Sequence, residues 1–140
     1  MSRTKATILC IDDHWNGLIS RKMLLEQNGY RVLEATSSYE GLKLFLSHSV
    51  DAVVVDYQMP GVSGDVLASK MKHINAHVPI MMLSAFEPLP KKKLKSVDTF
   101  LAKSQSPKKL LSSLEQLLEG PQKPFFSRWL DSWRGRNQGH

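Results

Sequence analysis

The sequence predicts an α/β protein with a doubly wound, five-stranded parallel sheet that is covered by helices on both faces. Two observations predict it. First, short and continuously apolar runs alternate with longer amphipathic segments along the chain. Second, the apolar runs do not alternate polar with apolar residues, which is typical of strands buried on both faces and hence of parallel sheets. Strands that alternate with helices over short links favour the doubly wound arrangement.

Five segments are expected to be strands. The most apolar are Thr7–Ile11, residues 52–55 and residues 79–83. Arg31–Ala35 and Thr99–Ala102 are less apolar candidates. The single cysteine, Cys10, stands in the middle of the first run, so we expect it to be a buried core thiol.

Helix signals fill the intervals between these runs. Residues 16–28 carry apolar residues at helical spacing, and Gly29 follows as a natural helix stop. Ser37 begins a segment with capping-box spacing, and Ser63 is expected to cap a third helix. The apolar positions that we expect to face the core are Leu18, Ile19, Met23, Leu25, Leu42, Phe45, Leu46, Leu67, Met71 and Ile74.

The last two intervals differ from each other. Ser106 followed by a proline predicts a capped helix, whose wide leucine stripe ends before Gly120. Between the fourth and fifth strands, Pro88 and Pro90 oppose helix formation, because each proline restricts itself and the residue before it. Only residues 91–96 are therefore expected to form a turn or two.

Composition limits the class of protein. The chain has 140 residues, which allows one domain, here 1–119, and a short appendage, 120–140. No apolar run approaches the roughly 20 residues of a membrane span, and no signal-peptide cleavage site follows the first run. We therefore expect a cytoplasmic protein. The net charge of +6 favours acidic proteins, anionic lipid or nucleic acid as partners, or it is only a well-solvated surface.

Chemically active side chains follow four of the expected strands. Sites in open parallel sheets form at the carboxyl ends of the strands. The first run ends on Asp12 and Asp13, the third on Asp56, the fourth on Ser84, and the fifth near Lys103. Three carboxylates, one hydroxyl and one ammonium group are thus expected to converge on one edge of the sheet.

Such a set favours phosphoryl transfer with a metal ion. Clustered carboxylates repel unless a cation lies among them, and oxygen ligands suit Mg²⁺ or Mn²⁺. A carboxylate left accessible beside the metal is a candidate nucleophile for phosphoryl transfer. Lys103 and Ser84 are placed to stabilise the transferring group. Gln58, two residues past Asp56, is expected to offer its backbone carbonyl to the metal.

Four sequence elements carry a resemblance to a known family. They are Ile-Leu-Cys-Ile-Asp12-Asp13, Val-Val-Val-Asp56-Tyr-Gln-Met-Pro60-Gly61, Met-Leu-Ser84-Ala85 and Phe100-Leu-Ala-Lys103, in this order. Over about residues 5–119, the chain resembles the response-regulator receiver domains of two-component signalling. The resemblance implies the strand order 2-1-3-4-5.

The resemblance also implies residue roles. Asp56 accepts the phosphoryl group from a histidine kinase or a histidine phosphotransfer protein. Asp13, Asp56 and the Gln58 carbonyl bind Mg²⁺ directly, whereas Asp12 acts through water. Ser84 and Lys103 contact the bound phosphoryl group. The remaining implied roles are that of a switch aromatic for Phe100 and an influence on phosphoaspartate hydrolysis for Gln58 and Phe86.

Three features depart from the family pattern. Ser104 follows Lys103 where the family usually has a proline. The fourth helix of the fold is expected to be shortened, which puts the usual output face in doubt. Residues 120–140 are too few for a DNA-binding or enzymatic output domain, so no specific DNA binding is expected.

The C-terminal segment, residues 120–140, predicts an amphipathic helix. Its apolar positions are Phe125, Phe126, Trp129, Leu130 and Trp133, with arginines around them. Three alternatives remain for this stripe: packing on its own domain or on a second copy in a homodimer, docking into a partner protein, or lying on an anionic membrane surface.

The sequence therefore favours a stand-alone receiver that signals through phosphorylation-controlled binding to a downstream protein and is not a turnover enzyme. A phosphatase with Asp56 as nucleophile is disfavoured, because Gln58 stands where such hydrolases have an acid. A degenerate receiver that binds partners without phosphorylation, or an adaptor acting through the C-terminal segment, remain alternatives.

Overall fold

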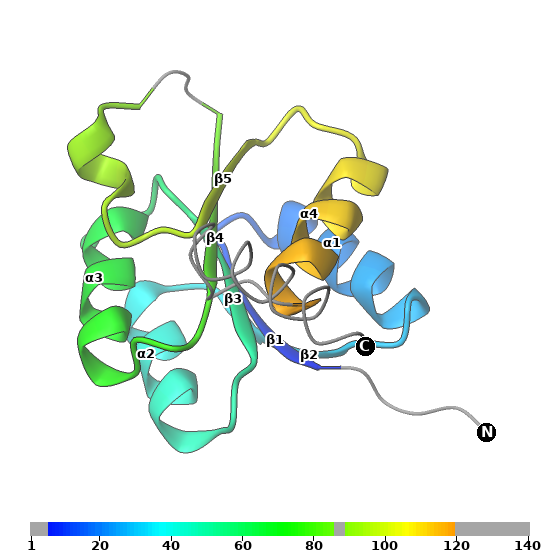
Figure 1. Cartoon of the computed structure of the whole chain (residues 1–140), viewed down its shortest axis with the longest axis horizontal. Coiled ribbons are helices and arrows are strands. Elements are labelled where there is room, and N and C mark those ends of the chain that lie inside the picture. The colour runs from blue at the N-terminus through cyan, green and yellow to red at the C-terminus, as the bar shows by residue number, and fades with distance from the viewer. Residues whose placement is uncertain (1–5, 86–88, 120–140) are drawn as a thin grey trace, which may run out of the picture.

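A five-stranded parallel sheet lies between two layers of helices in the computed structural model, which describes residues 6–85 and 89–119 (Figure 1). The strands are β1 (Thr7–Ile11), β2 (Arg31–Ala35), β3 (Ala52–Asp56), β4 (Ile80–Ser84) and β5 (Thr99–Ala102). Their order is β2-β1-β3-β4-β5, and every neighbouring pair is parallel. The predicted fold class and strand order are confirmed.

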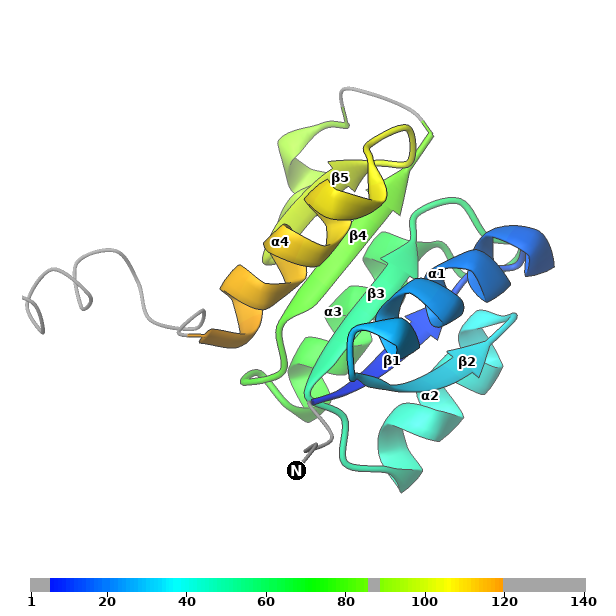
Figure 2. The same cartoon turned by 90° about the vertical axis from the view of Figure 1, so that its right-hand side faces the viewer.

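The helices divide between the two faces of the sheet (Figures 1 and 2). One face carries α1 (Trp15–Gln27) and α4 (Pro107–Glu119). The other carries α2 (Ser38–Ser47), α3 (Gly64–Ile74) and the short 3₁₀ helix η1 (Lys91–Leu94). Among the described residues, no helix is long and apolar enough to cross a membrane.

Each helix layer has its own core. Beneath α1 and α4, buried leucines of both helices pack on inward residues of the strands, among them Ile8, Val54 and Met81. Beneath α2 and α3, a second core gathers around Leu9, Val53 and other residues on the opposite face of the strands. Successive strand residues point to opposite faces, so the consecutive apolar residues of the strands fill both cores.

Cys10 of β1 is a buried core residue, as expected. It is fully buried, and this burial raises the pKa of its thiol to about 12. The thiol therefore stays protonated at neutral pH and packs as a small apolar side chain.

Three of the predicted core positions are wrong. Met23, Leu46 and Ile74 are exposed, at 54%, 62% and 48%. The α-helix turns about 100° per residue, so a helix on a flat sheet buries only a narrow stripe. Met23 lies two positions from the buried Leu25, Leu46 is one position past the buried Phe45, and Ile74 is the last residue of α3.

The helix caps are confirmed in two cases and wrong in one. The Ser37 hydroxyl accepts the amide of Glu40 at 3.1 Å, and the Ser106 hydroxyl accepts the amide of Lys109 at 3.1 Å. Ser63 stands at the start of α3 without accepting an amide; its hydroxyl donates instead to the Asp65 carboxylate at 2.5 Å. Ser63 thus occupies the N-cap position of α3, but its hydroxyl serves as a donor to Asp65 and does not cap the helix.

The crossover from β4 to β5 is shortened, as the prolines predicted. Among its described residues the only helical turn is η1, which begins after Pro90 and has four residues. Lys93 donates its amide to the Pro90 carbonyl at 2.9 Å, which closes this turn.

The loop after β3 is fixed by a close backbone contact. Gly64, the first residue of α3, donates its amide to the Tyr57 carbonyl at 2.8 Å. A Cβ at this position would collide with the backbone carbonyl of Asp56. Gly64 thus allows α3 to begin directly against the end of the strand that carries Asp56.

We expect Gly64→Ala to lower the free energy of unfolding by about 2 kcal/mol, because two backbone segments must move apart. Urea denaturation followed by circular dichroism measures the change. Alanine favours helices, so propensity alone would act in the opposite direction. Lys70→Ala on the exposed face of α3 is the control. Equal stability of Gly64→Ala and the wild type would contradict the assigned contact.

Candidate functional site

Acidic side chains meet where the strand order reverses, between β1 and β3. Asp12 and Asp13 follow β1, and Asp56 ends β3. Ligand atoms of these three residues and of His14 lie within 4.8 Å of one another. Asp12 and Asp56 are buried, at 0% and 2% exposure, whereas a quarter of the Asp13 side chain is exposed. The predicted convergence of the three carboxylates is thus present in the structure.

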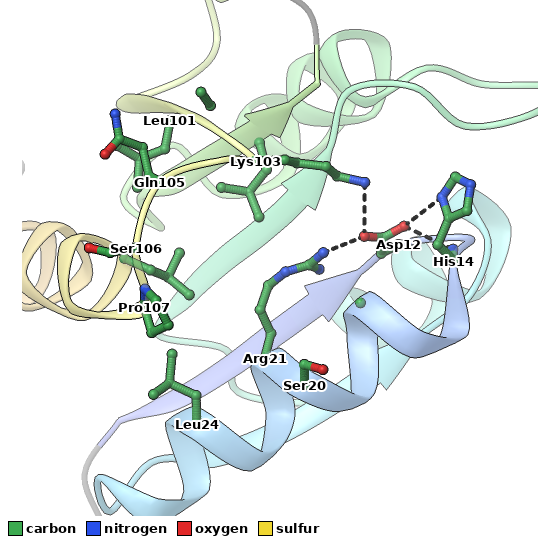
Figure 3. A pocket seen from close by; sticks show the side chains of 14 residues that line it. Asp12, His14, Ser20, Arg21, Leu24, Leu101, Lys103, Gln105, Ser106 and Pro107 are labelled. Atoms are coloured by element: carbon green, nitrogen blue, oxygen red, sulfur yellow. Dashed lines mark hydrogen bonds and ion pairs between the residues drawn. The ribbon is translucent and has the colours of Figure 1, made fainter.

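Lys103 reaches this cluster from the end of β5 (Figure 3). Its backbone amide donates to the Ser84 carbonyl at 2.8 Å, which fixes it beside the end of β4. Its Nζ lies 3.1 Å from Asp56 Oδ2 and 3.3 Å from Asp12 Oδ2. One ammonium group therefore bridges the carboxylates of two neighbouring strands.

The other predicted site residues lie on β4, on β5 and in the loop after β3. Ser84 is fully buried at the end of β4, and Phe100 is half-buried on β5 opposite Met82. Gln58 is exposed in the loop after β3. The roles of Ser84, Phe100 and Gln58 stay predictions. Phe86 and the C-terminal segment 120–140 lie outside the described residues.

The buried carboxylates differ in their electrostatics. Burial and the neighbouring charge of Asp12 raise the pKa of Asp56, and Lys103 offsets this only in part. Burial alone would also raise the pKa of Asp12, but the His14 amide and the Arg21 guanidinium outweigh it and lower that pKa. Of these two carboxylates, Asp56 is therefore the one whose negative charge the site stabilises less.

Two oxygens of the cluster fit a divalent cation. Asp13 Oδ1 and Asp56 Oδ2 are buried and accept no hydrogen bond from the described residues, although His14 and Lys103 stand near them. Buried carboxylate oxygens without hydrogen bonds are costly unless a cation binds them. The donor set consists of oxygens, which suits Mg²⁺.

The sequence reasoning missed Arg21. This residue of α1 donates from Nη2 to Asp12 Oδ2 at 2.6 Å, and its side chain is 13% exposed. His14, also missed, donates its amide to Asp12 Oδ1 at 2.9 Å. The spacing did contain a signal, because Arg21 lies three residues after Leu18 and four before Leu25, on the buried stripe of the helix. A charged residue on such a stripe requires a partner.

Comparison with known proteins agrees with this geometry. The family model of the response regulator receiver domain matches residues 8–115. The chain belongs to this family. Among solved structures, a CheY-like receiver domain protein of Methanospirillum hungatei is 25% identical with a TM-score of 0.80, and covers 84% of this chain and 97% of its own. The response regulator TrrA of Thermotoga maritima, solved in complex with Mg²⁺-BeF, is 29% identical with a TM-score of 0.78, and covers 81% of this chain and 100% of its own.

Curated relatives are longer than this receiver. The probable transcriptional regulator ycf27 of Cyanidium caldarium is 31% identical over 79% of this chain and 45% of its own length. The phosphate regulon regulatory protein PhoB of Pseudomonas aeruginosa is 29% identical over 80% of this chain and 51% of its own length. The chain thus spans about half the length of these relatives.

We expect Asp56→Asn to raise the free energy of unfolding by about 1 kcal/mol at pH 7 in EDTA. A raised pKa in the folded state means that ionising Asp56 costs folding free energy. The advantage of asparagine should therefore be absent well below pH 3.8, the ordinary pKa, and grow as the pH rises through and above it.

Urea denaturation at several pH values measures this difference. Glu26→Gln on the exposed side of α1 removes the same charge away from the site and is the control. Added Mg²⁺ should reduce the advantage, because the metal neutralises the cluster. An asparagine variant that is less stable than the wild type in EDTA at pH 7 would refute this electrostatic assignment.

Proposed function

We propose that this receiver accepts one phosphoryl group on Asp56 and signals through a change in protein binding. The observation that carries the proposal is the state of the Asp56 carboxylate. It stands buried at the end of β3, with Oδ2 3.1 Å from the Lys103 ammonium and with two further carboxylates beside it. A carboxylate held in this way is a nucleophile with a counter-charge already in place.

The transfer follows from these positions. A carboxylate oxygen of Asp56 forms a bond to the phosphorus of a phosphohistidine donor as the P–N bond breaks. The electron pair of that bond stays on the imidazole nitrogen. Lys103 stabilises the negative charge of the phosphoryl oxygens, and the Ser84 hydroxyl at the end of β4 is assigned a hydrogen bond to them. Water later attacks the phosphorus, which releases phosphate and restores the carboxylate.

A divalent cation belongs to this proposal. Asp13 and Asp56 supply the oxygens that fit Mg²⁺ or Mn²⁺, with the Gln58 carbonyl as a third ligand and Asp12 acting through water. When bound, the metal neutralises negative charge on the phosphoryl group. The TrrA structure in complex with Mg²⁺-BeF supports the choice of metal for this site.

The donor and the output are assigned by family. A histidine kinase or a histidine phosphotransfer protein is the proposed donor, and a downstream protein is the proposed target, in the cytoplasm. Ser84 and Phe100 are the proposed switch pair, because Phe100 is half-buried on the strand next to the one that Ser84 ends. The protein catalyses its own phosphorylation and dephosphorylation and is not a turnover enzyme on other substrates.

We expect one added phosphoryl group by intact-mass analysis after incubation with acetyl phosphate and Mg²⁺. The gain should be absent in EDTA and in Asp56→Asn, and strongly reduced in Lys103→Ala, because the phosphoryl charge then lacks its counter-ion. Asp51→Asn, which removes a carboxylate at the opposite end of the sheet, should be modified like the wild type.

Two results would change the assignment. A phosphoryl group that persists in Asp56→Asn would place the acceptor elsewhere. A wild-type protein that neither gains a phosphoryl group nor binds beryllofluoride with Mg²⁺ would favour the degenerate receiver, which binds partners without phosphorylation.

A further inference from the structure

Arg21 enters the acidic site from the side of α1. Helical side chains lean toward the N-terminus of their helix, so Arg21 extends along α1 over Gly17, four residues earlier, to Asp12. Figure 3 shows Arg21 and Lys103 reaching toward the same carboxylate of Asp12, with His14 on its other side. The Arg21 nitrogen Nη2 lies 2.6 Å from Asp12 Oδ2, which is shorter than the 3.3 Å from Lys103 Nζ.

Gly17 makes this path available. A Cβ at Gly17 would lie 2.9 Å from Arg21 Nη2 and 3.6 Å from Asp12 Oδ2. Any larger residue would therefore occupy the space that the guanidinium uses. The contact between Arg21 and Asp12 therefore depends on glycine at position 17.

The ion pair is buried, unlike an ordinary surface salt bridge. The side chains of Arg21 and Asp12 are 13% and 0% exposed. Arg21 Nη1 is buried and has no hydrogen-bond partner among the described residues. The guanidinium thus depends on Asp12, and removing either partner would leave a buried charge uncompensated.

Both oxygens of Asp12 are occupied in this arrangement. Oδ1 accepts the His14 amide, and Oδ2 contacts Arg21 and Lys103. Oδ2, which faces both cations, therefore has little capacity left for a metal-bound water, and Oδ1 can accept one further hydrogen bond. The three carboxylates face two cations, Lys103 and Arg21, instead of one. The net charge of the whole group is then −1 instead of −2, so a dication is attracted less.

We propose that Arg21 is a positioning residue that acts as the internal counter-ion of Asp12. By holding Asp12 in this ion pair, it lowers the affinity of the acidic site for magnesium. The inference rests on the proposed metal site. The magnesium concentration needed to fill the site would then be set in part by a residue of α1. Coulomb repulsion between a monocation and a dication on the order of 5 Å apart corresponds to about a tenfold change in affinity even in a water-like dielectric.

A cavity gives the guanidinium room to move. About 380 Å³ of space lies between α1 and the start of α4, lined by Gly17, Arg21, Leu24, Lys103 and Ser106 among others. Arg21 can therefore yield to an incoming metal ion without unfolding α1, at the cost of its contact with Asp12. The equilibrium between the two positions sets the magnesium concentration that the site requires.

Isothermal titration calorimetry of the full chain with MgCl₂ at fixed ionic strength tests the proposal. Arg21→Met keeps the volume and removes the charge, and should bind Mg²⁺ about tenfold more tightly than the wild type. Lys22→Met is the matched control. It removes the same charge one residue further along α1, where Lys22 pairs with Glu34, and should bind Mg²⁺ like the wild type.

Two further variants separate charge from packing. Gly17→Ala displaces the guanidinium while keeping the arginine, and should also tighten binding. Arg21→Lys keeps the positive charge and should stay within about threefold of the wild type. In EDTA, Arg21→Met should melt at a lower temperature than the wild type, because Asp12 loses its counter-ion. A role in packing alone would lower stability without tightening metal binding.

The outcomes are distinct. A folded Arg21→Met protein with wild-type magnesium affinity would overturn the inference and leave the proposed metal site standing. If Arg21→Met does not fold, the magnesium affinity of Gly17→Ala decides: tighter binding than in the wild type supports the inference, and unchanged binding overturns it. If the wild type and the variants all fail to bind Mg²⁺, the metal site of the proposed function is wrong and the inference falls with it.

Discussion

The parallel pairing of β1 with β3 is the constraint on which the site depends. Val55 pairs with Ile11, so the residues that follow each strand leave the sheet side by side. Asp12 and Asp56 are thereby forced together at a buried edge, and the rest of the site compensates for their repulsion. Lys103 does so from β5, and Arg21 does so from α1. The repulsion that the fold must offset is also what favours a cation among these carboxylates.

The negative charges of Asp12 and Asp56 are not compensated equally, and this difference separates the roles of the two carboxylates. Asp12 receives the His14 amide and the guanidinium, which lower its pKa, whereas Asp56 has Lys103 and a raised pKa. A well-satisfied carboxylate is a poor nucleophile because its charge is already bound. Asp56, whose Oδ2 has the Lys103 ammonium at 3.1 Å, is less well compensated, which agrees with its proposed role as the nucleophile. A well-compensated carboxylate and a poorly compensated one thus lie beside each other.

The sequence predicted what depends on short stretches of the chain. Apolar runs marked the strands, and because parallel strands end at one edge, Asp56, Ser84 and Lys103 could be placed before the structure was known. Pro88 and Pro90 predicted the shortened crossover by a local steric rule. Arg21 was not predicted, because its partner Asp12 lies on another element and only the helix orientation brings them together. A related reason explains the wrong core assignments of Met23, Leu46 and Ile74. Periodicity shows which side of a helix faces the core, but not how wide the buried apolar stripe is.

The short crossover between β4 and β5 also affects the edge of the sheet that β5 forms. β5 is an edge strand, and an edge presents unpaired backbone groups that another chain can join. This strand has only four residues, and residues 96–98 separate it from the lysine-rich segment 91–95, Lys-Lys-Lys-Leu-Lys. A very short edge strand and nearby lysines are two of the ways in which sheets avoid pairing with another chain. The shortened crossover therefore gives β5 a lysine-rich approach as well as a thinner helix layer.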